Sequence, residues 1–334
     1  MNILVTGGLG YIGSHTCVEL INHHHDVVIV DNLYNSNINV LNKIEEITKI
    51  KPKFYEVDIT NYLDLENVFK ENKFDAVIHF AGLKAVGESV SIPLTYYRNN
   101  VFGSINLYDL MVKYDVNNLV FSSSATVYGD SFTVPFKEEY GQGKCTNPYG
   151  QSKAMNENII IDTCAANPKM SAVILRYFNP IGAHESGLIG EIPNGIPNNL
   201  VPYVAQVVSG KRDYLRVWGN DYDTIDGTGV RDYIHVCDLA RAHVLAIDYA
   251  SKHNGSEIIN VGSGKGYSVL QVIKAYEKAC GKPIPYKIME RRPGDIDTCY
   301  ADTNKAYELL GFKTTYDIDK MCLDTYRFNC KLDI

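Results

Sequence analysis

The chain has 334 residues, more than one hydrophobic core usually supports, so we expect two lobes. It carries 32 Lys and Arg residues against 39 Asp and Glu residues, and the net charge of −7 argues against nucleic acid as a partner. We see no signal peptide and no apolar run long enough to span a membrane. The eight cysteines are scattered without paired metal-binding spacing, so we expect a cytoplasmic protein with no metal site and no membrane partner.

A strand, a glycine-rich turn and a helix are predicted at the start of the chain. Residues 1–5 form a short apolar run, typical of a buried parallel strand. They lead through Gly7, Gly10 and Gly13 into an apolar-periodic segment over residues 14–21. This glycine spacing permits a tight turn, close approach of the backbone to a pyrophosphate and close packing of helix on strand. The pattern therefore predicts a dinucleotide site.

An acid at the end of the second predicted strand indicates which dinucleotide binds. The strand covers residues 26–30 and is followed by Asp31, which lies 18 positions past Gly13. A carboxylate at about this spacing accepts a hydrogen bond from the ribose 2′-hydroxyl and repels a 2′-phosphate. The sequence therefore favours NAD over NADP.

Apolar runs alternate with helical patterns up to about Phe178, and this alternation predicts parallel strands joined by helices. The further runs are 53–57, 76–80, 119–122 and 172–176. We predict an α/β fold, with a doubly wound parallel sheet (Rossmann) over residues 1–178 as the NAD-binding domain. Pro, Gly and Asn residues become frequent after Asn179 and mark a smaller α/β lobe over residues 179–334, which would bind the substrate. The segment 233–249 has a helical pattern, and we expect a return to the first lobe near 233–250.

Tyr149 and Lys153 are four residues apart, so on a helix they share one face. Pro148, directly before Tyr149, suits a helix start. A phenol with a pKa of about 10 is a weak base at neutral pH, but a cation one turn away favours its phenolate, as would a bound nicotinamide cation. The pair is therefore a candidate base for a sugar or alcohol hydroxyl.

The motifs together resemble the extended short-chain dehydrogenase/reductase family and, within it, the UDP-galactose 4-epimerases. The resemblance runs along nearly the whole chain and is most specific at 79–89 and 121–129. It also covers the segments 7–16, 147–153, 176–182 and 227–236.

The resemblance implies a set of residues that bind NAD. Ser124 would bind the reacting C4 oxygen, Tyr149 would act as the base, and Lys153 would lower the pKa of Tyr149 and hold the nicotinamide ribose. The other implied cofactor contacts are Gly7, Gly10, Tyr11, Ile12, Gly13, Asp31, Asn32, Asn35, Ser36, Asp58, Ile59, Phe80, Ala81, Gly82, Lys84, Asn99 and Phe178.

The resemblance also implies a UDP-sugar site that shares Ser124 and Tyr149. Arg231 and Arg292 would bind the diphosphate, which accepts bidentate charge-assisted hydrogen bonds. Asp295 would bind a ribose hydroxyl, and the single tryptophan, Trp218, could stack on the uracil. The other residues implied at this site are Asn179, Asn199, Leu200, Arg216, Val217 and Cys299.

The implied reaction is inversion of C4 of a UDP-hexose through a transient 4-keto sugar, with NAD retained through turnover. A 4,6-dehydratase on the same scaffold would carry an Asp-Glu pair directly after the position of Ser124, where this chain has Ala125 and Thr126. The same motifs would also suit a dehydrogenase that releases NADH or a non-catalytic NAD-binding regulator, and measured turnover separates both from an epimerase.

The residue at position 299 bears on sugar specificity. Relatives with tyrosine there resemble enzymes restricted to UDP-glucose and UDP-galactose, whereas a small residue leaves room for a C2 acetamido group. Cysteine at this position predicts activity on UDP-GlcNAc and UDP-GalNAc as well. A restricted enzyme is the alternative, because Tyr300 could refill the space. The resemblance also implies a homodimer joined through about 93–114 and 149–167.

Overall fold

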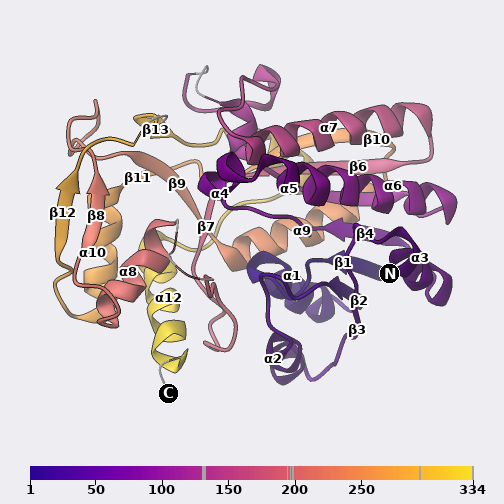
Figure 1. The fold of residues 1–334 in the computed structure, drawn as a ribbon, viewed down its shortest axis with the longest axis horizontal. Helices are drawn as coiled ribbons and strands as arrows, with labels where there is room; N and C mark the ends of the chain where they lie inside the picture. The colour runs from indigo at the N-terminus through magenta and orange to yellow at the C-terminus, as the bar shows by residue number, and fades with distance from the viewer. Residues whose placement is uncertain (130–132, 194, 196, 198, 293–294, 333–334) are drawn as a thin grey trace.

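Seven parallel strands form the main sheet of this computed structural model (Figure 1). The structure describes residues 1–129, 133–193, 195, 197, 199–292 and 295–332. The order of the strands across the sheet is β10-β6-β5-β4-β1-β2-β3, and every neighbouring pair is parallel. The strands are β1 (Asn2–Thr6), β2 (Asp26–Asp31), β3 (Lys53–Glu56), β4 (Ala76–His79), β5 (Asn118–Ser124), β6 (Ser171–Tyr177) and β10 (Gly255–Val261). The predicted doubly wound parallel sheet is confirmed.

Helices cover both faces of this sheet because its strands are apolar on both sides. Ile3 and Val5 of β1 belong to the core on one face, and Leu4, between them, belongs to the core on the other. The first face carries α1 (Tyr11–Asn22), α2 (Asn39–Thr48), α9 (Val236–Ala250) and α11 (Asn304–Leu310). The second carries α3 (Tyr62–Glu71), α6 (Gly103–Lys113) and α7 (Pro148–Ala166), with α4 (Val86–Ser91) and α5 (Pro93–Tyr97) packed against α7.

The strand order changes direction where a dinucleotide site is expected. From β1 the chain adds β2 and β3 on one side and β4, β5 and β6 on the other. Ligands of open α/β sheets bind outside the carboxyl ends of the strands at this switch of direction. The glycine turn follows β1, and Ser124 ends β5, so both predicted motifs lie at this edge of the sheet.

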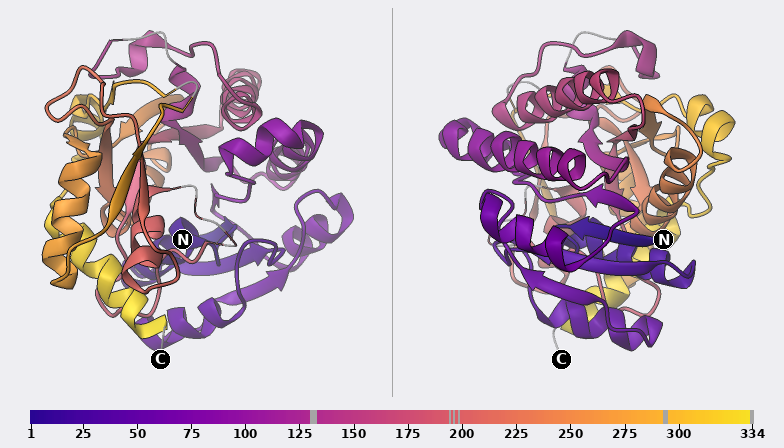
Figure 2. Two further views of the ribbon diagram at one scale, coloured as in Figure 1. Left: turned by 60° about the vertical axis from the view of Figure 1, so that its left-hand side comes forward. Right: turned by 90° about the vertical axis from the view of Figure 1, so that its right-hand side faces the viewer.

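A smaller lobe has its own core and two small sheets, and it lies beside the large sheet in Figure 1. Figure 2 shows α10 (orange) and α12 (yellow), which pack against each other in this lobe. Its helices are α8 (Leu200–Val208), α10 (Val269–Cys280) and α12 (Ile318–Leu332). Its strands are β7 (Asn179–Ile181), β8 (Leu215–Trp218), β9 (Val230–His235), β11 (Gly266–Ser268), β12 (Tyr286–Met289) and β13 (Thr298–Cys299).

The chain returns to the larger lobe over a longer stretch than the sequence predicts. Both α9 and β10 belong to that lobe, so the return runs to Val261 rather than ending near residue 250. The helical prediction for 233–235 is wrong, because these residues end β9, and the helix begins at Val236. His235 caps α9 by accepting a hydrogen bond from the Cys237 backbone, so strand and helix meet without a linker.

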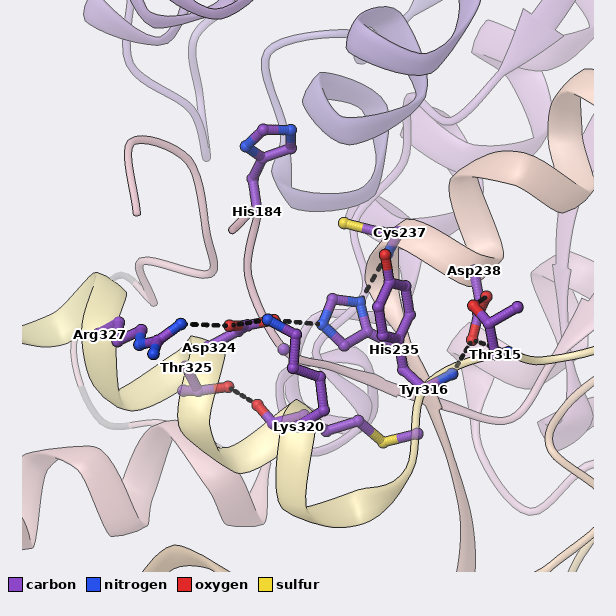
Figure 3. A network of polar contacts seen from close by, with 12 residues as sticks. His184, His235, Cys237, Asp238, Thr315, Tyr316, Lys320, Asp324, Thr325 and Arg327 are labelled. Carbon is purple, nitrogen blue, oxygen red and sulfur yellow. Dashed lines mark hydrogen bonds and ion pairs between the residues drawn. The ribbon is translucent and has the colours of Figure 1, made fainter. Parts of the chain in front are cut away.

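A polar network at this junction ties α12 to the start of α9 (Figure 3). The buried His235 ring donates from Nε2 to Asp324 Oδ2 over 3.2 Å, and Lys320 donates to the other carboxylate oxygen over 2.8 Å. Asp238, also buried, accepts hydrogen bonds from the backbone of Thr315 and Tyr316. The last segment of the chain is thereby fixed to the crossing point between the lobes.

All eight cysteines are free thiols in the structure. In the part of the chain that the structure describes, no helix has the length and apolarity that crossing a membrane requires.

A fully buried ion pair joins α7 to β6. Arg176 donates from Nε and Nη2 to the two carboxylate oxygens of Glu157 over 3.0 and 2.7 Å, and both side chains are 0% exposed. Ser123 and Gln142 also donate to this carboxylate, and Arg176 donates to the Gly141 carbonyl. Both charges are therefore paired and hydrogen-bonded, as a buried pair requires.

We predict that Glu157→Gln lowers the free energy of unfolding by about 3–5 kcal/mol, because it leaves the Arg176 charge buried without its counterion. Urea denaturation would measure the change. Glu46→Gln is the matched control, since Glu46 pairs with Lys43 on the surface, and its loss should cost less than about 1 kcal/mol. Equal effects of the two substitutions would contradict the prediction.

Candidate active site

The turn after β1 has the backbone geometry that its glycines predict. Gly7 has φ +70°, and a Cβ there would lie 2.7 Å from the Ala81 nitrogen. A Cβ at Gly13 would lie 2.3 Å from the Gly7 oxygen, so α1 packs directly on the turn. The N-cap of α1 is Gly10, whose side chain cannot cap, so the amides of the first turn have no side-chain acceptor there. These amides and the helix dipole suit an anion.

Asp31 ends β2 beside this turn. Its Oδ2 accepts from the Leu9 backbone over 3.0 Å, and its Oδ1 accepts from Leu33 N and Ser36 Oγ over 2.9 and 2.7 Å. Asn32 donates to Asp58, which also accepts from Thr60. The second and third strands are thus followed by polar groups that hold one another at the edge of the sheet.

The remaining sequence-predicted cofactor residues lie around the same edge. Tyr11 opens α1 and donates from its hydroxyl to the Gly182 carbonyl over 2.7 Å, which joins the two lobes. Phe80 lies near the buried His243 at 4.7 Å between ring centroids, and the Ala81 amide donates to the Thr6 carbonyl. The others are placed in α1 (Ile12), on the segment after β2 (Asn35), after β3 (the buried Ile59), after β4 (Gly82), on the π-helical turn η1, Arg98–Phe102 (Asn99), and after β6 (Phe178).

Tyr149, Lys153 and Ser124 come together where α7 begins against the end of β5. Asn147 caps α7 by accepting from the Gly150 amide over 2.9 Å, and Pro148 is its first residue, as predicted. The Ser124 hydroxyl lies near the Tyr149 phenol and lowers its pKa. The buried Lys153 ammonium donates to the Ser122 carbonyl over 2.6 Å and lies 6.0 Å from the centroid of the Tyr149 ring.

Burial and two neighbouring groups act on the pKa of Tyr149 in this structure. Burial raises the pKa of Tyr149 above its ordinary value, and the Ser124 hydroxyl and the charge of Lys84 oppose this rise. Burial also lowers the pKa of Lys153 to about 8, although the charge of Glu157 raises it. The charge of Lys84 thus favours the Tyr149 phenolate in this structure, and the Lys153 ammonium lies on the same side of α7, 6.0 Å from the centroid of the Tyr149 ring.

Lys84 is held by an acid that sequence reasoning did not identify. Its ammonium is 2.8 Å from Glu191 Oε1 and 5.9 Å from the centroid of the Tyr11 ring. The same Glu191 oxygen accepts from Asn199 Nδ2 over 3.5 Å. Desolvation lowers the pKa of Lys84, but Glu191 raises it, and the net direction is upward. Glu191 therefore links a predicted cofactor residue to a predicted substrate residue, and its 107-residue separation from Lys84 left no local signal.

The sequence-predicted diphosphate and ribose residues form a second group, in the smaller lobe. Asp295 lies 2.9 Å from Arg292 and 3.7 Å from Arg231, so one carboxylate holds both guanidinium groups together. Asn179 is in β7 and donates to the carbonyl of Asp232 in β9. Two arginines held close together in this way can bind an anion in two places at once.

Strand β8 and helix α8 supply the other predicted substrate residues. Trp218 ends β8, with the Arg292 guanidinium 6.0 Å from its ring centroid. Arg216 is exposed and Val217 is buried, so their side chains point to opposite faces of β8 and do not converge. Leu200 begins α8 and packs on the core of the smaller lobe.

Cys299 is in β13 and pairs with Arg231 of β9. It packs against the apolar cluster that contains Phe178, Tyr128 and Phe136. Burial raises the pKa of its thiol to about 12, so the side chain is a neutral, compact group. It thus lies between a predicted cofactor residue and a predicted diphosphate residue.

Polar residues beneath the site are structural. His79 exchanges hydrogen bonds with Thr6 and Ser104 on either side of its ring, which is typical of a structural histidine. Burial lowers its pKa to about 3. Asn100, which the sequence analysis did not select, binds the Leu83 backbone through its amide group and donates to Ser152 on α7. No group of three or more metal-binding side chains occurs among the residues that the structure describes.

Comparisons with known proteins show the family of this chain. Residues 3–262 match the model of the NAD dependent epimerase/dehydratase family. The UDP-glucose 4-epimerase of Bacillus subtilis (strain 168) is 56% identical over 328 residues, which is 98% of this chain and 96% of that protein.

Solved structures give the same result. The structure of UDP-glucose 4-epimerase from Bifidobacterium longum in complex with NAD+ and UDP has a TM-score of 0.95 and 52% identity, and covers 99% of this chain and 98% of its own. The UDP-Glc/GlcNAc 4-epimerase from Campylobacter jejuni has a TM-score of 0.87 and 36% identity, and covers 99% of each chain. This chain belongs to the NAD dependent epimerase/dehydratase family.

Proposed function

We propose that the protein is an NAD-dependent 4-epimerase that interconverts UDP-glucose and UDP-galactose. The observation that carries this proposal is the meeting of Ser124, Tyr149 and Lys153 at the same edge of the sheet as the glycine turn. The UDP-glucose 4-epimerases to which the chain is similar over almost its whole length support the choice of substrate.

The residues present fit NAD. Only glycine fits where Gly7 meets Ala81, and the backbone there is free to lie against a pyrophosphate. The amides of the first turn of α1 would hold the pyrophosphate, and Asp31 would accept from an adenosine ribose hydroxyl. Lys84 and Lys153 would lie near its phosphate and nicotinamide-ribose portions. When bound, NAD supplies the acceptor and donor of the hydride at C4 of the sugar.

Tyr149 would remove the proton from the 4-hydroxyl and later return it. Its pKa is raised by burial, so the positive charges near it decide how readily the phenolate forms. Ser124, which lies near Tyr149, would hold the C4 oxygen in line with the phenol. After oxidation the 4-keto sugar turns over in the pocket before it is reduced on its other face, and this inverts C4.

The nucleotide part of the substrate would supply most of the binding energy. Arg231 and Arg292 would hold the diphosphate, Asp295 a ribose hydroxyl, and Trp218 would stack on uracil. Anchoring remote from C4 lets the sugar itself be held loosely enough to rotate.

We also propose that the enzyme accepts UDP-GlcNAc and UDP-GalNAc. Cys299 is small, neutral and placed beside the strand that carries Arg231. A larger side chain at this position would fill space that a C2 acetamido group needs. The Campylobacter jejuni enzyme, whose description names both UDP-Glc and UDP-GlcNAc, has the same fold as this chain.

A homodimer is the third part of the proposal. The helical segments 93–113 and 148–166 form an open apolar groove of about 500 Å³, lined by Tyr97, Arg98, Val101, Phe102, Ile105 and Met155. Phe102 is 50% exposed, and Ile105 and Met155 are also exposed. A second copy of the chain would cover these side chains with its own equivalent helices, as isologous interfaces do. We place the protein in the cytoplasm, where its eight free thiols would stay reduced.

Purified protein without added NAD should convert UDP-galactose, and Tyr149→Phe should abolish that turnover because the phenol that carries the proton is lost. NAD released by denaturation and measured by absorbance should stay at the level of the unsubstituted protein. An active Tyr149→Phe enzyme would contradict the role of Tyr149. No conversion by the unsubstituted protein, even with NAD added, would favour a dehydrogenase or a regulator instead.

Cys299→Tyr should remove activity on UDP-GalNAc and spare activity on UDP-galactose, because the added ring fills the acetamido space. Shape alone discriminates by about 1–3 kcal/mol, so the ratio of the two kcat/KM values should change by about tenfold or more. Cys145→Ser is the control, since Cys145 lies outside β13, on the segment before α7. Equal loss on both substrates would contradict a gate at position 299.

Sedimentation should give twice the 37.4 kDa mass of one chain. Phe102→Glu should shift the protein toward the monomer, because a charge in the groove cannot be buried without a partner. Ile225→Glu, at a residue 82% exposed outside the groove, is the control and should leave the dimer intact. A monomeric unsubstituted protein would refute the dimer.

A further inference from the structure

Two tyrosine hydroxyls in the described part of the chain are buried without a hydrogen-bond partner, on Tyr222 and Tyr276. A buried hydroxyl normally finds a partner, because leaving it unpaired is unfavourable. Tyr222 is 5% exposed, and Tyr276 is 0% exposed. The two hydroxyls have different neighbours, and these neighbours indicate which hydroxyl would bind a ligand.

Tyr222 packs against Arg291, the residue directly before the proposed diphosphate residue Arg292. The Arg291 guanidinium lies 3.9 Å from its ring centroid. Desolvation and the charge of Asp295 raise the pKa of its phenol, and Arg291, Arg231 and Arg292 lower it. Its ring also fills the space beside Gly219, directly after Trp218.

The described groups around this hydroxyl leave it without an acceptor. Guanidinium groups only donate hydrogen bonds, so none of the three arginines can pair with a donated phenolic hydrogen. Asp295 could accept, but its carboxylate pairs with Arg292 and Arg231 and makes no hydrogen bond with the Tyr222 hydroxyl. The missing partner is therefore an acceptor that the same arginines attract, which is an anionic oxygen.

We propose that the Tyr222 hydroxyl donates a hydrogen bond to a phosphoryl oxygen of the bound nucleotide diphosphate. Tyr222 is thus a further substrate-binding residue, beside Arg231 and Arg292. The inference rests on the proposed function, because it requires a UDP-sugar in this lobe. The Tyr222 hydroxyl adds a neutral donor to the two cations Arg231 and Arg292. Because a hydrogen bond is directional, it would orient one phosphate as well as bind it.

Tyr276 provides an internal comparison. It is on α10 in the core of the smaller lobe, and its neighbours Cys322, Cys280 and Tyr326 carry no positive charge. Its hydroxyl is equally unpaired, yet none of these neighbours would attract an anion. Tyr276→Phe removes the same atom as Tyr222→Phe at a place that no substrate should reach.

The test is calorimetric titration of the NAD-containing full-length protein with UDP and, separately, with uridine. Tyr222→Phe should weaken UDP binding by about tenfold to a hundredfold, the range for a hydrogen bond to a charged group, and leave uridine binding unchanged. Tyr276→Phe should change neither. Neither substitution should lower the melting temperature without nucleotide, because each removes an unpaired hydroxyl.

Four results would overturn the inference. Unchanged UDP affinity in Tyr222→Phe, or equal weakening of UDP and uridine, would exclude the phosphoryl contact while leaving the epimerase proposal intact. Equal weakening by Tyr276→Phe would show a general loss of packing. Failure of the unsubstituted protein to bind UDP would overturn both this inference and the proposed function.

Discussion

The buried pair of Glu157 and Arg176 is the interaction on which the geometry of the candidate site depends. Tyr149, Lys153 and Glu157 are spaced four residues apart on α7, so they share one face of the helix. Arg176 in β6 and Ser123 in β5 both bind the Glu157 carboxylate. Because the helix is fixed to these two strands at its middle, its first turn is held against the end of β5. The positions of Tyr149 and Lys153 are therefore set by an ion pair that takes no part in the chemistry.

The same carboxylate affects the charge of the site. Its field raises the pKa of Lys153, which burial would otherwise lower further. A structural ion pair and a candidate catalytic cation are therefore electrostatically linked along one helix. The bond from Lys153 to the Ser122 carbonyl adds direction, since it points the ammonium along the end of β5.

The elements that local sequence decides could be predicted. Apolar runs of five residues between turns predicted β1 and β2 to within one residue, and Pro148 marked the start of α7. The end of β9 was missed because its partners β7, β11 and β13 are far away in the chain, and a strand that runs directly into a helix has no turn residues between them. Pairings over long distances decide such boundaries, and a single sequence does not display them.

The same difference between local and long-range signals applies to the residues of the candidate site. The glycine spacing and the Tyr149–Lys153 spacing are local, so the residues alone were enough to interpret each of them. The contact of Lys84 with Glu191 crosses from one lobe to the other, and the upward pKa of Tyr149 is set by burial. Burial and cross-lobe contacts arise only from the packed fold, which explains why the chemistry of the tyrosine was harder to anticipate than its position.

The path of the chain between the two lobes limits how such a protein can evolve. The chain leaves the large sheet after β6, returns with α9 and β10, leaves for β11 and α10, and comes back with α11 before ending in α12. A gene fragment ending near residue 178 would lack the seventh strand and expose the edge of β6. The lobes are therefore not modules that recombination can exchange between relatives. On such an interleaved frame, a change of sugar preference would need single substitutions, such as one at Cys299 in β13, rather than the exchange of a domain.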